Sequence, residues 1–325
     1  ISEGLVGSEM CIRDRFQYSS HLKLLQSKAL KNIFKYERGL GTFIDNHHVK
    51  IQKSNEENKT IYAENIIIAT GSKPRTIPNI YVDEKIIMTS DGVDHMKSFP
   101  KSMVIVGAGV IGCEYATIFS NFGKTKVYLI DRSDRILPFE DTDISDMISK
   151  NLKEKGVTIH NKAQLERLEV KDGEVEYELS YKDGKKEIIR VEKALLSVGR
   201  KLCIDGLKME NAGVTLSKRG VHIGDINTQT NIPNIYVVGD ASGHISLVNV
   251  GELEGRDAVE RMFSKKYYPL NYKNICTIMF LQPEVASVGI NEKTCIEENI
   301  PGKVVKLDYS CIARAIAMRT TEGFF

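Results

Sequence analysis

The chain has 325 residues, of which 42% are hydrophobic and 27% are charged, and its formal net charge is +2. This composition is that of an ordinary globular protein with two or three domains, and a nearly neutral chain argues against nucleic acid as a partner. The longest apolar run, Met103–Cys113, contains three glycines. It is shorter than the roughly 20 residues that span a bilayer, so no membrane partner is predicted. The six cysteines include no close pair, which favours a reduced, cytoplasmic compartment.

The two ends of the chain differ from the rest. Residues 1–15 show no periodicity and are interpreted as a non-native segment outside the fold. Residues 321–325 stop within an apparent element. We therefore expect a fragment of a longer protein.

The first predicted elements lie between residues 16 and 100. Residues 16–38 carry apolar side chains at helical spacing and predict a helix. Alternating side chains predict strands in segments 41–52 and 60–70, the second of which ends in an apolar strand at 66–69. A linker that contains three prolines then leads to a new unit.

That unit alternates strands with helices. The predicted elements are a strand at 103–106, a glycine turn, a helix to about residue 122, a strand at 127–130, a helix at 143–155, a strand at 157–159, hairpin turns at 172–173 and 183–184, and a strand at 194–198. Between the two hairpin turns, apolar side chains alternate with polar ones such as Glu176 over residues 174–181 and predict a half-buried strand. A strand at 235–238 and a helix at 246–263 follow, and strand-rich sequence begins near residue 268.

The strongest chemical signal is the GxGxxG pattern of Gly107, Gly109 and Gly112. It follows a strand, opens a helix near Val110, and precedes an acid, Asp131, at the end of the next strand. The first glycine permits a tight turn, the second lets the backbone approach a pyrophosphate, and the third allows close strand–helix packing. The free N–H groups of the helix favour phosphate. Asp131 would accept hydrogen bonds from the adenine ribose and favour NAD, while NADP stays possible beside Arg132. The alternative is a glycine turn without a ligand.

Two further strands end in small or acidic residues. One runs from Asn234 to Gly239-Asp240, and the other from Ile66 to Thr70-Gly71-Ser72. Asp240 would lie at the carboxyl end of a strand, where open α/β sheets bind ligands. Each could instead be an ordinary helix cap or strand end. Together the three strands suggest more than one nucleotide site.

The order of the motifs resembles the pyridine nucleotide-disulfide oxidoreductases. The residues that carry the resemblance are ATGS at 69–72, GAGVIGCE at 107–114, SVGR at 197–200, GDA at 239–241, PEVASVG at 283–289 and ARAIAMRTTEGF at 313–324. Within the family the chain looks most like dihydrolipoyl dehydrogenases and soluble Si-specific transhydrogenases.

The resemblance implies an α/β fold with two Rossmann-like, doubly wound, three-layer domains. Residues 16–100 and 225–265 would form an incomplete FAD domain, residues 101–224 the NAD domain, and residues 266–325 the start of an α+β interface domain. It further implies a homodimer.

The resemblance also assigns cofactor contacts. Thr70, Gly71 and Ser72 would contact FAD, and Asp240 would bind its ribityl chain. The helix entered at Ser246, Leu247, Val248 and Asn249 would direct its N-terminus at the flavin ring, where its dipole stabilises negative charge. Asp131 would bind the ribose of NAD, while Glu114 and Gly199 would lie beside the nicotinamide. A bland alternative for Glu114 is an exposed helix acid.

The family's redox disulfide and its C-terminal His–Glu pair have no counterpart here, so no catalytic residue is predicted. No metal site is predicted either. The parent would transfer a hydride between nicotinamide and flavin, as a dihydrolipoyl dehydrogenase or, alternatively, as a transhydrogenase from NADPH to NAD. A third interpretation takes the chain itself as a catalytically incomplete nucleotide-binding fragment.

Overall fold

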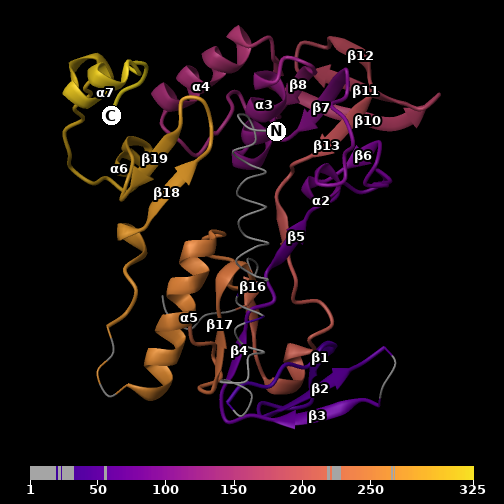
Figure 1. The fold of residues 1–325 in the computed structure, drawn as a ribbon, viewed down its shortest axis with the longest axis vertical. Coiled ribbons are helices and arrows are strands. Elements are labelled where there is room, and N and C mark those ends of the chain that lie inside the picture. The colour runs from indigo at the N-terminus through magenta and orange to yellow at the C-terminus, as the bar shows by residue number, and fades with distance from the viewer. Residues whose placement is uncertain are drawn as a thin grey trace. The chain divides into compact units, whose positions relative to one another are not determined.

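The structure is a computed structural model that describes residues 33–54, 57–217, 220–221, 228–264 and 268–325, with single positions at 20, 23 and 266. The described residues form two compact units (Figure 1). Unit 1 joins Pro74–Gly199 to Cys276–Phe325, and unit 2 joins the described part of Asp14–Lys73 to Arg200–Ile275. The segment 1–15, interpreted as non-native, lies outside the described residues. The predicted domain ranges stay a prediction.

Unit 1 is built on a parallel sheet of five strands in the order β6-β13-β7-β8-β9. The strands are β6 (Ile87–Met88), β7 (Ser102–Val106), β8 (Lys126–Ile130), β9 (Thr158–His160) and β13 (Lys193–Leu196). Helix α3 (Val110–Asn121) connects β7 to β8, helix α4 (Thr142–Glu154) connects β8 to β9, and the short α2 (Ser90–Val93) precedes β7. Parallel strands joined through helices form a Rossmann-like sheet, which confirms the predicted α/β class.

Both faces of this sheet are buried (Figure 1). Met103 and Ile105 belong to the core that contains residues of α3 and α4, whereas Val104 and Val106 face a second core. The second core includes the antiparallel strands β10 (Ala163–Lys171), β11 (Glu174–Tyr181) and β12 (Lys186–Val191). Alternation along β7 thus places its side chains in two separate cores, as expected for a central strand.

The predicted hairpin turns at 172–173 and 183–184 are confirmed, since Gly173 and Gly184 adopt φ values of 84° and 85° between these strands. The alternation predicted for β11 is also present, with Val175, Tyr177 and Leu179 buried. Glu176, expected on the open face, is only 8% exposed. Its carboxylate is covered because three cations bind it, which are Arg167, Lys171 and Arg190.

Residues 276–325 belong to unit 1, and the hairpin at their start packs against the core of α3 and α4. Strands β18 (Cys276–Met279) and β19 (Val285–Val288) form an antiparallel hairpin, followed by α6 (Glu292–Glu297), the 3-10 turn η4 (Tyr309–Cys311) and α7 (Ala313–Met318). Met279, Leu281 and Val285 belong to the same core cluster as Met103 and Ile105. This segment is therefore an integral part of unit 1.

Unit 2 contains a second, smaller set of strands. Antiparallel β1 (Leu40–Phe43), β2 (His48–Gln52) and β3 (Lys59–Tyr62) form one sheet, and β4 (Ile66–Ile68) pairs in parallel with β17 (Ile235–Val237). Strand β5 (Ser72–Pro74) pairs with β14 (Arg200–Leu202), and β15 (Leu216–Ser217) with β16 (Gly220–Val221). The 3-10 turns η1 (Met209–Ala212), η2 (Gly239–Ser242) and η3 (Tyr272–Asn274) and helix α5 (Val248–Phe263) complete the unit.

Some predicted elements differ from the structure at their ends. The segment 41–52 is two strands because the carboxylate of Asp45 accepts hydrogen bonds from the N–H groups of His47 and His48, at 2.8 and 2.7 Å, and so stabilises a turn. The segment 60–70 likewise divides into β3 and β4. The helix predicted at 246–263 begins at Val248.

The helix predicted at 16–38 lies mostly outside the described residues. Of its described residues, positions 20 and 23 are helical, whereas the last part, residues 33–38, is not. Glu37 in this part forms ion pairs with Lys53 and Lys59, and these ion pairs hold the segment beside the β2–β3 hairpin.

Candidate functional site: a braced glycine turn and a second strand edge

The glycine turn between β7 and α3 gives each of its three glycines a different role. Gly107 has φ of 102°, a conformation that a side chain would strain, and a Cβ there would lie 2.5 Å from the carbonyl oxygen of Ser197. A Cβ on Gly112 would lie 1.9 Å from the carbonyl oxygen of Gly107. A Cβ on Gly109 would meet nothing within 4 Å. Gly107 and Gly112 are thus required by the fold, whereas Gly109 leaves open space beside the backbone.

The peptide groups of this turn are held by the chain itself. The N–H of Ala108 donates to Oδ2 of Asp131 at 2.7 Å, and its carbonyl accepts from the N–H of Leu137 at 2.9 Å. The hydroxyl of Ser197 donates to the carbonyls of Val106 and Gly107, at 3.0 and 2.8 Å. Leu137 adopts φ of 45°, a strained value for leucine, while its side chain is fully buried. The turn is therefore formed in the protein alone.

Asp131 lies beside the turn, as its spacing from Gly112 predicts. Its Oδ1 accepts from the N–H of Ser133 at 2.8 Å, and its Oδ2 accepts from Ala108. Each carboxylate oxygen can accept more than one hydrogen bond, so the same group retains acceptors for sugar hydroxyls. Asp131 thus combines bracing of the turn with a free acceptor surface.

Helix α3 begins next to this acid. Its first residue is Val110, its N-cap is Gly109, and no side chain caps its first amides or adds an acid to its first turn. Uncapped N–H groups at the start of a 12-residue helix are a site that favours an anion. The predicted phosphate position thus has open space and free donors together.

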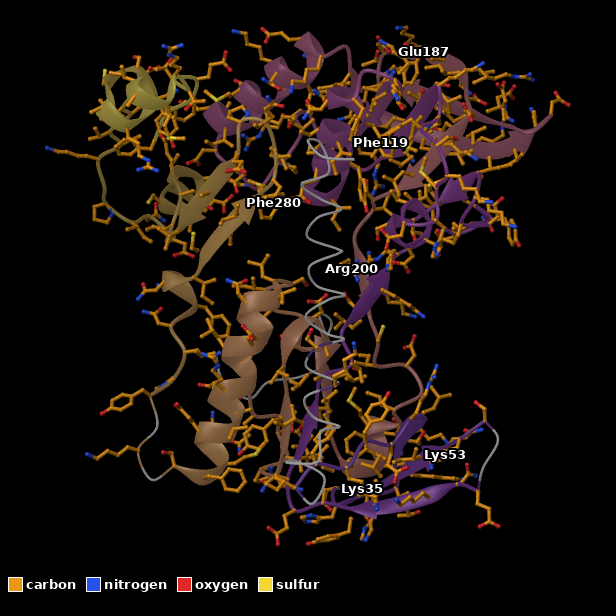
Figure 2. All side chains as sticks on the ribbon, in the orientation of Figure 1. Lys35, Lys53, Phe119, Glu187, Arg200 and Phe280 are labelled. Carbon is orange, nitrogen blue, oxygen red and sulfur yellow. The ribbon has the colours of Figure 1, made fainter. Side chains whose placement is uncertain are left out.

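Glu114 lies in the second turn of α3 and is half-buried. Its Oε1 accepts from the backbone N–H of Phe280 at 3.0 Å, in the loop that follows β18 (Figure 2). Burial raises the pKa of this carboxyl, while the Phe280 N–H opposes that rise by stabilising the charged form. The alternative of an exposed helix acid is therefore wrong.

Gly199 follows β13, the neighbour of β7 in the sheet. It adopts φ of 100°, and its carbonyl accepts from the N–H of Arg75 at 2.9 Å. A Cβ on it would meet nothing within 4 Å. Its position after Ser197, which braces Gly107, brings it to the edge of the sheet that carries the glycine turn.

A second set of predicted residues gathers in unit 2, where β4 and β17 end side by side. The hydroxyl of Ser72 donates to Oδ2 of Asp240, and Nε of Arg200 donates to the Ser72 hydroxyl at 2.6 Å. Nη2 of Arg200 also donates to the Ser72 carbonyl at 2.9 Å. Gly71, at φ of 68°, and the exposed Thr70 precede this cluster.

The start of α5 completes the predicted set in unit 2. Ser246 and the N-cap Leu247 precede the helix, Val248 is 71% exposed, and Asn249 follows it; no side chain caps the first amides. A Cβ on Gly251 would lie 3.2 Å from Cα of Gly239, so the helix packs closely against η2.

Several site residues could not be found from sequence motifs. Glu254 is fully buried, and its carboxylate accepts from the Gly239 N–H at 2.6 Å and from the Tyr272 hydroxyl at 2.8 Å. Its only sequence signal is an acid among small residues in a helix. Leu137 acts through its backbone N–H, which a residue pattern does not specify. Ser197 belongs to the motif at 197–200, but the motif does not reveal that its hydroxyl holds the turn.

The described residues contain neither a cluster of metal ligands nor a helix that could cross a membrane. No group of three or more His, Cys, Asp or Glu side chains among them is arranged to hold a metal ion. No helix in the same part of the chain is long and apolar enough to cross a membrane.

Comparison with known proteins finds a matching family and similar relatives. Its residues 7–255 match the family model "Pyridine nucleotide-disulphide oxidoreductase", and residues 275–325 match the dimerisation domain of that family. The chain is 34% identical to a dihydrolipoyl dehydrogenase of Chlamydia trachomatis and 32% identical to one of Bacillus subtilis, each over 288 residues. Each match covers 88% of this chain and 60% of the relative, so the chain spans about three fifths of these proteins.

Solved structures agree with the sequence matches. The Cu(II) complex of the HOCl-induced flavoprotein disulfide reductase RclA from Escherichia coli is 26% identical and superposes with a TM-score of 0.84. The match covers 99% of this chain and 71% of that one. The family match, the glycine turn and the parallel sheet agree, and the chain therefore belongs to the pyridine nucleotide-disulphide oxidoreductase family.

Proposed function

We propose that the protein is an FAD-dependent NAD(P)H oxidoreductase of the dihydrolipoyl dehydrogenase kind, and that unit 1 binds its nicotinamide dinucleotide. The observation that carries the proposal is the glycine turn. Gly109 leaves space for a pyrophosphate, and the free amides of α3 face it. Asp131 stands beside the turn with acceptors for the ribose.

In unit 2 we assign the FAD contacts to Thr70, Gly71, Ser72, Asp240 and the residues Ser246–Asn249. The cluster of Ser72, Asp240 and Arg200 supports this assignment because it fixes the Asp240 carboxylate at the carboxyl end of β17. The positive end of α5 would stabilise negative charge on a bound flavin. A bound flavin would supply the hydride chemistry, while these residues bind and orient it.

In the nicotinamide half of the site we assign Glu114 and Gly199. A half-buried carboxylate can accept a hydrogen bond from the carboxamide of a nicotinamide and so fix the orientation of its ring. The positive φ of Gly199 leaves its surroundings clear of a side chain. Together these residues would hold one end of the dinucleotide while Asp131 holds the other.

The domain ranges given above, a homodimer formed through residues 266–325 and a cytoplasmic location are part of the proposal. The match of residues 275–325 to a dimerisation domain supports the homodimer. Among the described cysteines all five are free, which is consistent with a reducing compartment.

A transhydrogenase is the second candidate, since it needs both NAD and NADP at one site. Asp131 disfavours a 2′-phosphate, but the adjacent Arg132 is exposed and can offer it a positive charge. Titration with NADH and NADPH separates the two candidates. Similar affinities favour the transhydrogenase, whereas a clear preference for NADH favours the dehydrogenase.

The experiment that tests the dinucleotide site is Gly109→Val. Backbone angles of φ −79° and ψ −168° and the empty space around Gly109 suit a valine, so the fold should survive. The added side chain occupies the phosphate position, and we expect the Kd for NADH to rise roughly tenfold or more. NADH fluorescence measures binding, and thermal unfolding checks the fold. Unchanged affinity in a stable variant would refute the proposed site.

A further inference from the structure

We infer that Asp141 is a positioning residue for the nicotinamide half of the site: it anchors the segment 276–325, whose Phe280 N–H holds the Glu114 carboxylate. This inference rests on the proposed function, because it takes Glu114 as a nicotinamide contact. It links three parts of the chain. These are the start of α4, the segment 276–325, which lies more than 130 residues later, and the side chain of Glu114.

Asp141 is unusual for an N-cap residue. It precedes α4 and has extended backbone angles, yet its side chain makes no hydrogen bond to the first amides of that helix. An N-cap aspartate normally accepts from those amides. Instead, Oδ1 of Asp141 accepts from the N–H of Lys293 at 3.1 Å, and Oδ2 accepts from the N–H of Glu292 at 3.2 Å. Asp141 therefore accepts from the first two amides of α6, whose N-cap is Asn291, instead of from the amides of its own helix.

Two further contacts join the start of α6 to the loop before α4. The side-chain amide of Asn291 donates to the Phe139 carbonyl at 3.1 Å, and Nζ of Lys293 donates to the Pro138 carbonyl at 3.0 Å. Asp141 is the only described residue of this loop that contributes a charged side chain to the contact with α6, through both of its oxygens. A charged acceptor strengthens these two hydrogen bonds. Further along the segment, Lys306 forms an ion pair with Asp143 of α4 at 2.6 Å, so Asp141 is the attachment at α6 and Asp143 a separate one.

The hairpin carries this attachment to Glu114. Strands β18 and β19 pair from Cys276 to Val288, and α6 begins four residues later. Met279 and Leu281 are each 5% exposed and packed in the core of unit 1. They flank Phe280 on both sides, and the N–H of Phe280 meets Oε1 of Glu114 at 3.0 Å.

Glu114 needs this partner. It is half-buried, and among the described residues the backbone N–H of Phe280 is its hydrogen-bond donor. A buried carboxylate without a donor rotates toward water or takes up a proton. Loosening the segment 276–325 should therefore disturb Glu114 while leaving the glycine turn and Asp131, which are braced independently, in place.

This difference provides the test, with two ligands that share their adenine half. NADH contains a nicotinamide and ADP-ribose does not. For Asp141→Ala we expect the Kd for NADH to rise about fivefold and the Kd for ADP-ribose to change by less than about twofold. Asp141→Asn keeps one acceptor oxygen and should fall between Asp141→Ala and the wild type. Asp146→Asn, an exposed acid on the same helix, is the matched control and should leave both values unchanged.

A double variant makes the assignment to Glu114 specific. If Asp141 acts through Glu114, adding Asp141→Ala to Glu114→Gln should weaken NADH binding less than it does in the wild-type background. Full additivity would overturn the inference, as would equal losses for NADH and ADP-ribose or no loss for either. Failure of the proposed function has a different signature, because the wild type would then bind neither ligand.

Discussion

The two candidate cofactor regions are built differently. In unit 1 the backbone groups of the glycine turn are themselves hydrogen-bonded, since the N–H of Ala108 donates to the Asp131 carboxylate and the carbonyl of Ala108 accepts from the Leu137 N–H. In unit 2 the edge of β4 and β17 depends on a side-chain cluster of Ser72, Asp240 and Arg200. The turn in unit 1 is also packed between two cores, whereas β4 and β17 form a sheet of two strands in the described part of unit 2.

The contrast suggests that the glycine turn of unit 1 is preorganised, whereas the edge of β4 and β17 in unit 2 depends more on its ligand. A site whose backbone is fixed in the protein alone loses little conformational entropy when a ligand binds. Side chains that bond mainly to one another can exchange those bonds for bonds to a ligand. We therefore expect substitutions in the turn to affect stability even without ligand, and equivalent substitutions in unit 2 to affect it less.

The largest expected effect is that of Gly112→Ala. The new Cβ would meet a backbone carbonyl at 1.9 Å, and neither β7 nor α3 can move without disturbing a core. We expect a loss of roughly 3 kcal/mol in the free energy of unfolding, at the upper end for overpacking. Urea denaturation followed by circular dichroism measures it.

The control for this variant is Gly109→Ala, three residues earlier, where a Cβ has no neighbour within 4 Å. It should cost less than about 1 kcal/mol, the usual scale of an N-cap change. Equal losses at the two glycines would mean that close packing of strand and helix does not explain the pattern, and the interpretation of the turn would fail.

The next effect compares the same substitution in the two regions. Asp131→Ala removes the acceptor for the Ala108 N–H and the expected ribose contact, so the Kd for NADH should rise about thirtyfold, equivalent to roughly 2 kcal/mol. Asp240→Ala should leave the Kd for NADH unchanged. Isothermal titration of both variants gives the comparison. If Asp131→Ala binds NADH as the wild type does, the ribose assignment is wrong.

The sequence predicts a feature of this structure when residue types and their spacing determine it, and fails when residues distant in the chain determine it. Residue types and their periodicity determine the turn at Gly107, the position of Asp131 and the alternation along β11. The structure has each of these features where it was expected. The burial of Glu176 and Glu114 was not predictable, because it results from Arg167, Lys171, Arg190 and Phe280, which are brought near by the fold.

The ends of elements show the same limit. Asp45 interrupts the segment 41–52 through hydrogen bonds that an alternating pattern does not reveal. Asp141 looks like an N-cap of α4 in the sequence, but in the structure it serves α6. In both cases a short acidic side chain had more than one set of amides within reach, and tertiary packing selected among them.

The smallest expected effect concerns Glu254, the buried acid of unit 2. Burial raises its pKa above the ordinary value of 4.5, although bonds from Tyr272 and Gly239 oppose the rise. Because the folded state then holds its proton more tightly than the unfolded state, this residue contributes stability below pH 4.5 that is lost as the pH rises through the folded pKa.

Glu254→Gln removes that titration while keeping one acceptor oxygen for Gly239 or Tyr272. We therefore expect the difference in unfolding free energy between wild type and variant to move in favour of the variant as the pH is raised from 4 to 7. Urea denaturation at several pH values measures it, and other groups cancel in the difference. A difference that is constant with pH, or that moves toward the wild type, would mean that hydrogen bonds to the charged carboxylate outweigh its burial. The η2–α5 contact would then resemble the braced turn of unit 1, and the contrast between the two regions would weaken.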